Sequence, residues 1–212
     1  MRGDVIIVEE HHRAAADRIV AHLTERVRRT DGRYIVTVAG ESGSGKSEMG
    51  KALKEAFDAT GQAALVLGQD DYFVLPPKSN DARRRENISW VGLNEVKLDL
   101  LNEQLEAAKA GAPTLTKPEV IYDEDRAIEE EVSLEGIAVV IAEGTYTTTL
   151  RAADTHVFID RDYHATLEAR KRRNREKFDP FIEQVLEIEH QLIRTHKPLA
   201  EVVITTDYDV RL

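Results

Sequence analysis

Eight consecutive residues at positions 40–47 read Gly-Glu-Ser-Gly-Ser-Gly-Lys-Ser and fit the pattern Gly-x-x-x-x-Gly-Lys-[Ser/Thr] without a mismatch. The three glycines allow backbone angles that other residues avoid, so successive N–H groups can converge on an anion. Lys46 supplies a mobile positive charge for the β- and γ-phosphates, and Ser47 offers a hydroxyl to Mg²⁺. The octet therefore predicts a site for a nucleoside triphosphate. Its predicted contacts, with the residue that follows, are Gly40, Glu41, Ser42, Gly43, Ser44, Gly45, Lys46, Ser47 and Glu48.

The segments that flank this octet have the patterns of a strand before it and a helix after it. Residues 34–39 are apolar and rich in β-branched side chains, which is typical of a buried parallel strand. After the octet, Met49, Leu53 and Phe57 recur every four residues and share one helix face. The phosphates would therefore lie at a helix N-terminus, where N–H groups and the helix dipole favour anions.

Carboxylates follow two further apolar segments. Asp70 and Asp71 come soon after residues 63–67, and Glu143 comes directly after the apolar run that ends at residue 142. Ligands of parallel sheets collect at the carboxyl ends of the strands, so these acids should lie opposite the octet. There, Asp70 could accept the proton of an attacking hydroxyl while Asp70 and Glu143 join Ser47 around Mg²⁺. A solvated turn and an ordinary strand end are the alternatives.

Basic and aromatic residues supply further candidates. Arg170 and Arg173 are three residues apart on a predicted helix over 162–177, so they share one face and could close over the phosphates. A solvated basic face is the alternative. Tyr72 and Trp90 could line a substrate pocket, although buried aromatic residues more often belong to the core.

The alternation of strands and helices predicts an α/β fold, namely a three-layer P-loop arrangement with a five-stranded parallel sheet and helices on both faces. We expect the strands at 34–39, 63–67, 137–142, 155–159 and 202–205, helices at 46–58, 98–108, 162–177 and 180–195, an irregular stretch at 74–92 and a β-ribbon at 114–134. A small strand (4–8) and an amphipathic helix (16–27) precede the sheet. The predicted division is therefore an N-terminal extension over 1–32 and the main domain over 33–212.

Composition excludes several classes of protein. The net charge of −10 argues against nucleic acid as a partner, because phosphate backbones are bound mainly by excess Lys and Arg. With no cysteine, the chain has neither disulfides nor thiolate metal sites, and its histidines lack zinc-site spacing. No apolar run approaches 18 residues and no signal peptide is recognisable, so we expect a cytoplasmic protein with no membrane partner. The N-terminal helix predicts packing on the domain or, in a homo-oligomer, on a second subunit.

Taken together, these landmarks resemble the uridine kinase and phosphoribulokinase family of P-loop kinases. The resemblance rests on the octet, the segment Gln69-Asp-Asp-Tyr-Phe73, the strand that ends in Ala142-Glu-Gly144, and Phe158-Ile-Asp160 leading into the arginine helix. It implies ATP and Mg²⁺ as cofactors, with Asp70 and Lys46 catalytic and with Ser47, Asp70 and Glu143 at the metal. Arg170 and Arg173 would be lid residues that reach the nucleotide. The substrate side would comprise Asp71, Tyr72, Trp90, Tyr122 and Arg126.

Two departures from the family pattern concern the nucleotide and the acceptor. Glu48 stands where the family usually has a second hydroxyl residue, and residues 87–92 replace the acidic segment that grips a nucleoside ribose. We therefore expect a uridine kinase-like enzyme that moves the γ-phosphoryl group of ATP to a hydroxyl of a small molecule, with the acceptor left open. A nucleotide-dependent regulatory switch, or a degenerate kinase that binds nucleotide without phosphotransfer, is the alternative.

Overall fold

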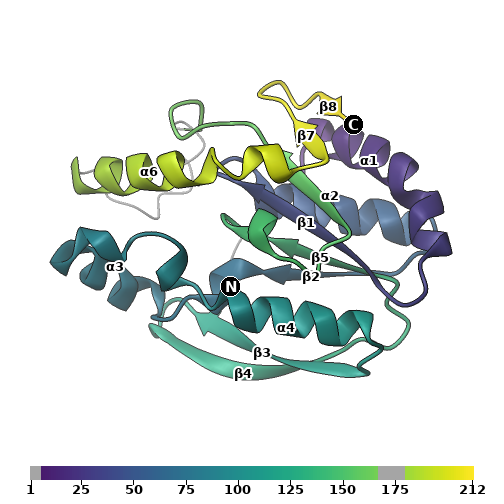
Figure 1. The fold of residues 1–212 in the computed structure, drawn as a ribbon, viewed down its shortest axis with the longest axis horizontal. Helices are drawn as coiled ribbons and strands as arrows, with labels where there is room; N and C mark the ends of the chain where they lie inside the picture. The colour runs from purple at the N-terminus through teal and green to yellow at the C-terminus, as the bar shows by residue number, and fades with distance from the viewer. Residues whose placement is uncertain (1–5, 167–179) are drawn as a thin grey trace.

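The computed structural model describes residues 6–166 and 180–212 and is built on a six-stranded sheet with the order β2-β5-β1-β6-β7-β8 (Figure 1). The first five of these strands are mutually parallel, and β8 runs antiparallel to β7. This arrangement confirms the predicted α/β fold and adds one short edge strand. The strands are β1 (Tyr34–Gly40), β2 (Ala64–Gly68), β5 (Val139–Glu143), β6 (Thr155–Ile159), β7 (Val202–Ile204) and β8 (Val210–Arg211).

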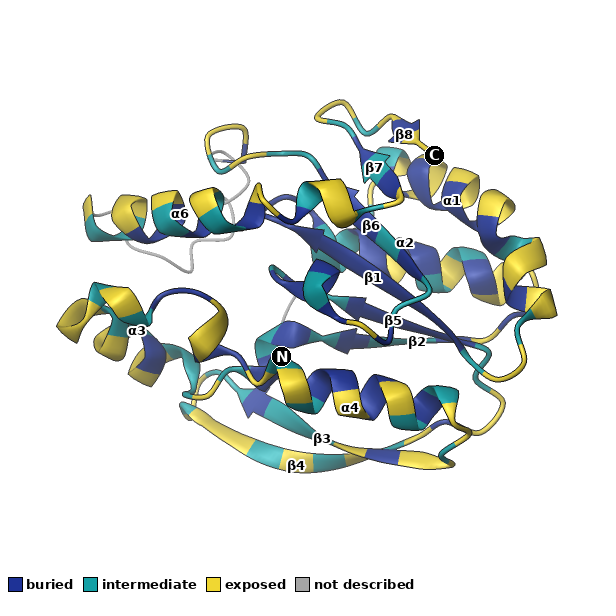
Figure 2. Ribbon diagram, in the orientation of Figure 1, coloured by how far each residue is buried: buried dark blue, intermediate teal, exposed yellow. Residues whose placement is uncertain are grey.

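Helices cover both faces of the sheet, so its central strands are apolar throughout (Figures 1 and 2). All seven residues of β1 are buried, and alternate side chains enter two different cores. Val36 and Val38 pack with α1 (Glu10–Arg29) and α2 (Lys46–Ala59). On the other face, Ile35 and Ala39 pack with α4 (Leu98–Lys109) and the end of α6 (Pro180–Ile193).

The N-terminal helix α1 is part of the first of these cores. Ile19 and Leu23 on its inner face are fully buried, and each stabilises the fold by about 2 kcal/mol. The predicted strand in front of the helix is wrong where it can be checked, because residues 6–9 are not in a strand. Its residues 4 and 5 lie outside the described ranges.

A separate two-stranded ribbon and a polar helix lie beside the sheet. The ribbon, β3 (Thr114–Ile121) with β4 (Arg126–Ser133), confirms the prediction for this stretch. The predicted irregular stretch over 74–92 is wrong in part, because it contains the helix α3 (Pro77–Glu86). This helix buries only Asn80 and so has no apolar stripe to reveal it. Short 3₁₀ turns complete the fold: η1 (Gln69–Tyr72), η2 (Ile88–Trp90), η3 (Leu93–Glu95), η4 (Thr147–Thr149) and η5 (Lys197–Leu199).

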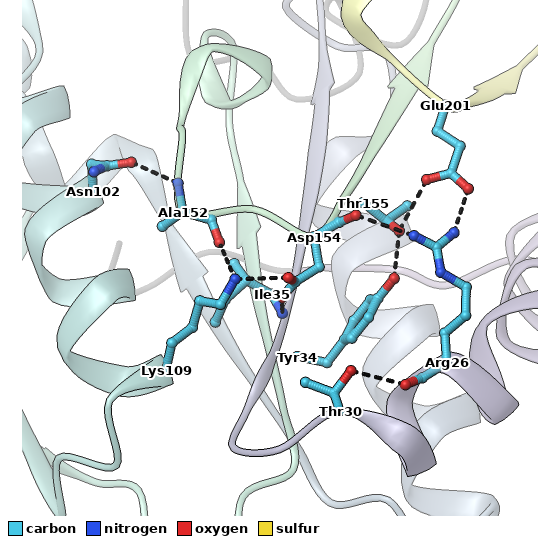
Figure 3. Close-up of polar contacts among 10 residues, drawn as sticks. All are labelled: Arg26, Thr30, Tyr34, Ile35, Asn102, Lys109, Ala152, Asp154, Thr155 and Glu201. Carbon is cyan, nitrogen blue, oxygen red and sulfur yellow. Dashed lines mark hydrogen bonds and ion pairs between the residues drawn. The ribbon is translucent and has the colours of Figure 1, made fainter.

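Polar contacts hold the helices to the amino-terminal ends of the strands, as Figure 3 shows. The carboxylate of Asp154 accepts the backbone N–H of Ile35 at 2.8 Å and the ammonium of Lys109 at 2.7 Å. Nearby, the hydroxyl of Tyr34 lies 2.8 Å from that of Thr155. These contacts join β1, α4 and the start of β6, which leaves the opposite, carboxyl end of the sheet for a ligand. In the described ranges, no helix combines the length and apolarity needed to cross a membrane.

Candidate active site

The glycine-rich loop turns directly from β1 into α2, and its glycines adopt the angles that the sequence predicted. Gly43 and Gly45 have φ angles of 74° and 100°, in the left-handed region that favours glycine. Gly45 is also crowded, because a Cβ atom there would lie 2.6 Å from the hydroxyl of Tyr208. Helix α2 begins at Lys46, so its unpaired N–H groups face the loop. The loop and the helix terminus together form an anion site.

The two reactive side chains of the loop, those of Lys46 and Ser47, are held by hydrogen bonds at its edge. The ammonium of Lys46 donates to the backbone carbonyl of Glu41 at 2.9 Å, which folds the positive charge across the loop. The hydroxyl of Ser47 donates to the carboxylate of Glu143 at 3.2 Å. The end of β5 therefore lies against the first turn of α2.

Two acids meet beside Ser47, and their proximity is electrostatically unfavourable. Burial, together with the negative charge of Asp70, raises the pKa of Glu143 to about 7. The charge of Lys46 and the hydrogen bond from Ser47 act in the opposite direction. Two carboxylates and a hydroxyl are oxygen ligands that suit Mg²⁺, and a bound cation would relieve the repulsion between the acids. The residues present therefore fit a magnesium ion.

A close approach of the backbone at Gly144 to Gln69 brings Asp70 next to Glu143. A Cβ atom on Gly144 would lie only 2.2 Å from the Cβ atom of Gln69, so only glycine lets these two segments meet. The side-chain carbonyl of Gln69 also accepts the N–H of Tyr146 at 2.7 Å. This contact ties the turn after β2 to the turn after β5. Asp70, which follows Gln69, is consequently held next to Glu143.

Asp71 and Tyr72, the next residues along this turn, are directed into the fold instead. Asp71 is 4% exposed and accepts the N–H of Val120 on the ribbon at 2.9 Å. Tyr72 is fully buried, and its hydroxyl donates to Gln104 of α4. Both side chains hold neighbouring elements together. Their contact with substrate stays a prediction, and the contacts described here favour a structural role.

The other substrate-side candidates lie around α3 and the tip of the ribbon. The indole N–H of Trp90 donates to Asn80 at 2.9 Å, while Arg126 is exposed and pairs with Glu124. The ring of Tyr122 lies beside the ammonium of Lys78, which is 5.8 Å from the ring centre. These three contacts are with residues outside the loop. The predicted lid residues Arg170 and Arg173, and most of their predicted helix, lie outside the described residues.

A second set of contacts, which the sequence did not reveal, surrounds the variable part of the loop. The carboxylate of Glu41 accepts the N–H of Tyr163 at 2.7 Å and lies 2.6 Å from His190 of α6. The hydroxyl of Thr166 donates to the carbonyl of Ser42 at 2.8 Å. These contacts attach the loop to the segment after β6. A pocket of about 380 Å³ lies there, lined by Glu41, Phe158, Ile159, Asp160, Arg161, Asp162, Ala165, His190, Arg194, Lys197 and Thr206. Because Glu41 occupies a variable position of the motif, its type gave no signal.

A glycine-rich loop between a central parallel strand and a helix, with acids at the ends of the neighbouring strands, defines a P-loop nucleotide-binding protein. The sequence model of the phosphoribulokinase / uridine kinase family matches residues 35–194. This chain belongs to that family, which is a family of kinases. The assignment confirms the predicted resemblance, and it agrees with the predicted enzyme class.

A curated relative agrees with this assignment. The bifunctional alpha-galactosidase/sucrose kinase AgaSK of Mediterraneibacter gnavus is 29% identical over 194 residues, which cover 85% of this chain and 21% of the relative. The chain thus spans about a fifth of the length of that curated relative.

Solved structures show the same fold at low sequence identity. A candidate fructose transport system kinase from a Silicibacter species has a TM-score of 0.68 and 20% identity, covering 87% of this chain and 95% of its own. A candidate uridine kinase from Bacillus stearothermophilus has a TM-score of 0.61 and 22% identity, and the match covers 90% of this chain and 97% of that structure. D-glycerate 3-kinase from Cryptococcus neoformans has a TM-score of 0.58 and 14% identity, covering 95% and 98%. At these identities the likeness is one of fold.

Proposed function

We propose that this chain transfers the γ-phosphoryl group of ATP to a hydroxyl group of a small molecule. The observation that carries the proposal is the meeting of Ser47, Glu143 and Asp70 beside the loop, at the carboxyl ends of neighbouring parallel strands. A site that only bound nucleotide would not need a second acid at the position where a phosphoryl acceptor arrives. Membership of a kinase family supports the same conclusion.

Each residue of the site has a distinct role in this reaction. Asp70 accepts the proton of the acceptor hydroxyl as the oxygen of that hydroxyl forms a bond to the γ-phosphorus. The bond between the γ-phosphorus and the bridging oxygen breaks, and ADP leaves with the electron pair. The loop N–H groups and Lys46 stabilise the negative charge on the phosphates. Most of the rate enhancement would come from this positioning and electrostatic stabilisation.

Magnesium would be held by Ser47, Asp70 and Glu143, together with phosphate oxygens and water. When bound, it neutralises charge on the β- and γ-phosphates. We include Arg170 and Arg173 in the proposal as lid residues that contact the phosphates, because the family resemblance implies this role. The division into an extension over 1–32 and a kinase domain over 33–212 also belongs to the proposal.

The acceptor that best agrees with the relatives is a polyhydroxylated one. The names of the relatives refer to sucrose, fructose, uridine and glycerate, all of which carry alcohol groups. The acidic segment expected of a nucleoside site is replaced here by residues 87–92, which disfavours uridine. A sugar or a sugar-derived alcohol is therefore the acceptor class that we propose.

An acceptor panel tests the proposed function directly. The chain is incubated with ATP, Mg²⁺ and one compound at a time from a set of sugars, sugar phosphates, glycerate and nucleosides, and the release of ADP is followed. We expect one acceptor to raise ADP release well above the rate with ATP alone. A slow hydrolysis that no acceptor changes would favour a regulatory switch, and nucleotide binding without any turnover would favour a degenerate kinase.

A further inference from the structure

The first turn of α1 lies against the nucleotide loop and contributes a buried histidine to it. His12 is only 5% exposed, and its ring is in edge contact with that of Tyr208, with 4.9 Å between the ring centres. Tyr208 donates in turn to the backbone carbonyl of Ser44 in the loop at 3.1 Å. A Cβ atom on Gly45 would lie 3.2 Å from Nε2 of His12. Among the described residues, this ring therefore lies directly against the loop.

Among the described residues, one ring nitrogen of His12 has a hydrogen-bond partner and the other has none. Nδ1 accepts a hydrogen bond from the backbone N–H of Glu9 at 3.1 Å, so the proton of the neutral ring is on Nε2. Nε2 is buried and has no hydrogen-bond partner among the residues that the structure describes. A buried donor without a partner is unfavourable, and native proteins usually satisfy such groups with a ligand or water when the fold does not.

The surroundings keep this ring neutral. Burial, assisted by the neighbouring His11, lowers the pKa of His12 to about 4. At neutral pH the ring is therefore an uncharged donor, although Glu48 and Glu9 favour its protonation. A second donor on the same side, Nε of Arg161, is also buried without a hydrogen-bond partner in the described ranges, and its guanidinium contacts the ring of Tyr208. Two unsatisfied donors thus flank the same edge of the loop.

Strand order gives the direction in which the nucleotide crosses the loop. Asp70 and Glu143 follow β2 and β5, which lie on one side of β1, whereas Tyr208 connects β7 and β8 on the other side. The γ-phosphate must be near Asp70 if that acid serves the acceptor. The opposite end of the triphosphate then points toward Tyr208 and His12.

We propose that His12 is a nucleotide-binding residue whose Nε2–H donates a hydrogen bond to an oxygen at the nucleoside end of ATP, on the α-phosphate or the ribose. This inference rests on the proposed function, because it requires ATP in the loop. It makes the N-terminal helix a part of the nucleotide site. Helix α1 supplies a contact that the octet itself does not contain.

The test compares three variants in their affinity for ATP with Mg²⁺, measured by calorimetry, and in thermal midpoint without ligand. His12→Leu removes the donor and keeps most of the ring volume, so ATP should bind at least about tenfold more weakly. Its unliganded midpoint should not fall by much, because an unsatisfied buried donor is also removed. His12→Gln places an amide N–H near the position of Nε2 and should keep affinity within about threefold of the unaltered chain.

His22→Leu is the matched control, because His22 lies on the same helix and pairs with Glu201, which directly precedes β7 at the amino-terminal end of the sheet. It should leave ATP affinity unchanged. Repeating the titrations with inorganic tripolyphosphate shows which oxygen accepts the hydrogen bond from His12. If His12→Leu loses affinity for ATP alone, that oxygen is on the ribose; if it loses affinity for both compounds, the oxygen is on the α-phosphate.

ATP affinity in His12→Leu equal to that of the unaltered chain would overturn the inference, as would an equal loss in His12→Gln. Failure of the unaltered chain to bind ATP would be a different result, because it would overturn the proposed function itself.

Discussion

At the scale of single residues, the site depends on which of two adjacent acids faces the nucleotide. Asp70 lies close enough to Glu143 to raise the pKa of that acid, whereas Asp71 accepts a hydrogen bond from the ribbon. The 3₁₀ turn that carries both residues sends consecutive side chains in different directions. The chemical difference between them is therefore one of orientation.

Replacing Asp70 tests its role as the base. Asp70→Asn removes the proton acceptor with little change in shape, so acceptor-dependent turnover should fall by about 10²–10⁴-fold. Affinity for ATP should stay within a few fold, because the loop is unaltered. Steady-state kinetics and a separate ATP titration measure the two effects. Lys46→Ala is the contrasting variant and should weaken ATP binding itself. Near-normal turnover in Asp70→Asn would remove Asp70 from the mechanism.

Replacing Asp71 gives the complementary result. Asp71→Asn should lower the free energy of unfolding by about 1–3 kcal/mol, because it removes the buried negative charge and the oxygen that faces the ammonium of Lys117 on the ribbon. The Michaelis constants of the folded enzyme should change little. A large rise in the Michaelis constant for the acceptor, at unchanged stability, would show that Asp71 contacts the substrate. Urea unfolding and initial-rate kinetics on the same preparation decide between the two roles.

The raised pKa of Glu143 predicts how stability depends on pH. Its pKa is about 7 in the folded protein and near 4.5 when unfolded, so between these values the folded state holds a proton that the unfolded state has lost. This acid therefore makes the magnesium-free protein less stable as pH rises from about 4.5 to about 7. Glu143→Gln should remove that contribution. Its free energy of unfolding should therefore rise relative to that of the unaltered chain, by up to about 1 kcal/mol for each pH unit between those two values. Urea unfolding in a chelating buffer at several pH values measures the difference, and parallel profiles would contradict the prediction.

At the scale of elements, a buried ion cluster joins α3, η3 and α6. The guanidinium of Arg84 donates two hydrogen bonds to Glu95, at 2.6 and 2.7 Å, and a third to Glu189 at 3.0 Å. Glu95 is fully buried and also accepts from Asn80 and from the N–H of Gly92. This cluster holds a helix that lacks an apolar stripe. It thereby fixes α3 against η3 and α6.

Two neighbouring arginines allow a matched test of this cluster. Arg84→Met leaves the buried carboxylate of Glu95 without its cation and should cost about 3–5 kcal/mol of unfolding free energy. Arg85→Met removes an exposed pair with Asp81 and a contact between the Arg85 guanidinium and the ring of Phe181, and should cost about 1 kcal/mol. Equal losses in the two variants would show that burial of the Arg84 pair contributes nothing special. Urea unfolding curves at constant pH provide both values.

At the scale of the whole molecule, the loop lies at the centre of the sheet and contacts elements from both ends of the chain. Helix α1, the segment after β6 and the turn between β7 and β8 all touch it. A ligand in the loop therefore binds a surface that exists only when these elements are assembled. Nucleotide binding should stabilise the fold as a unit.

Thermal unfolding tests this coupling. ATP with Mg²⁺ at about 100 times its dissociation constant should add about 2.7 kcal/mol, which corresponds to a rise in midpoint of about 5–10 °C for a chain of this size. Lys46→Ala at the same ATP concentration should show a much smaller rise. An unchanged midpoint with saturating ATP would contradict binding to the folded state.

The sequence by itself determined the parts of this protein whose signals are local. The octet at 40–47, the apolar strand before it and the helix stripe after it each depend on residues a few positions apart. The five parallel strands and the ribbon were predicted for the same reason. The acids at 70 and 143 were placed together correctly because parallel strands share one ligand-binding edge.

Tertiary structure decided what depends on residues far apart in the chain. Helix α3 was missed because its stability comes from Arg84 and Glu95 rather than from an apolar face. The contact of Asp71 with the ribbon was not predicted, because only the packing of the ribbon reveals it. The burial of His12 against Gly45 likewise depends on how α1 lies on α2. A periodic pattern shows which face of an element is covered, but its partner is set by the packing of the whole chain.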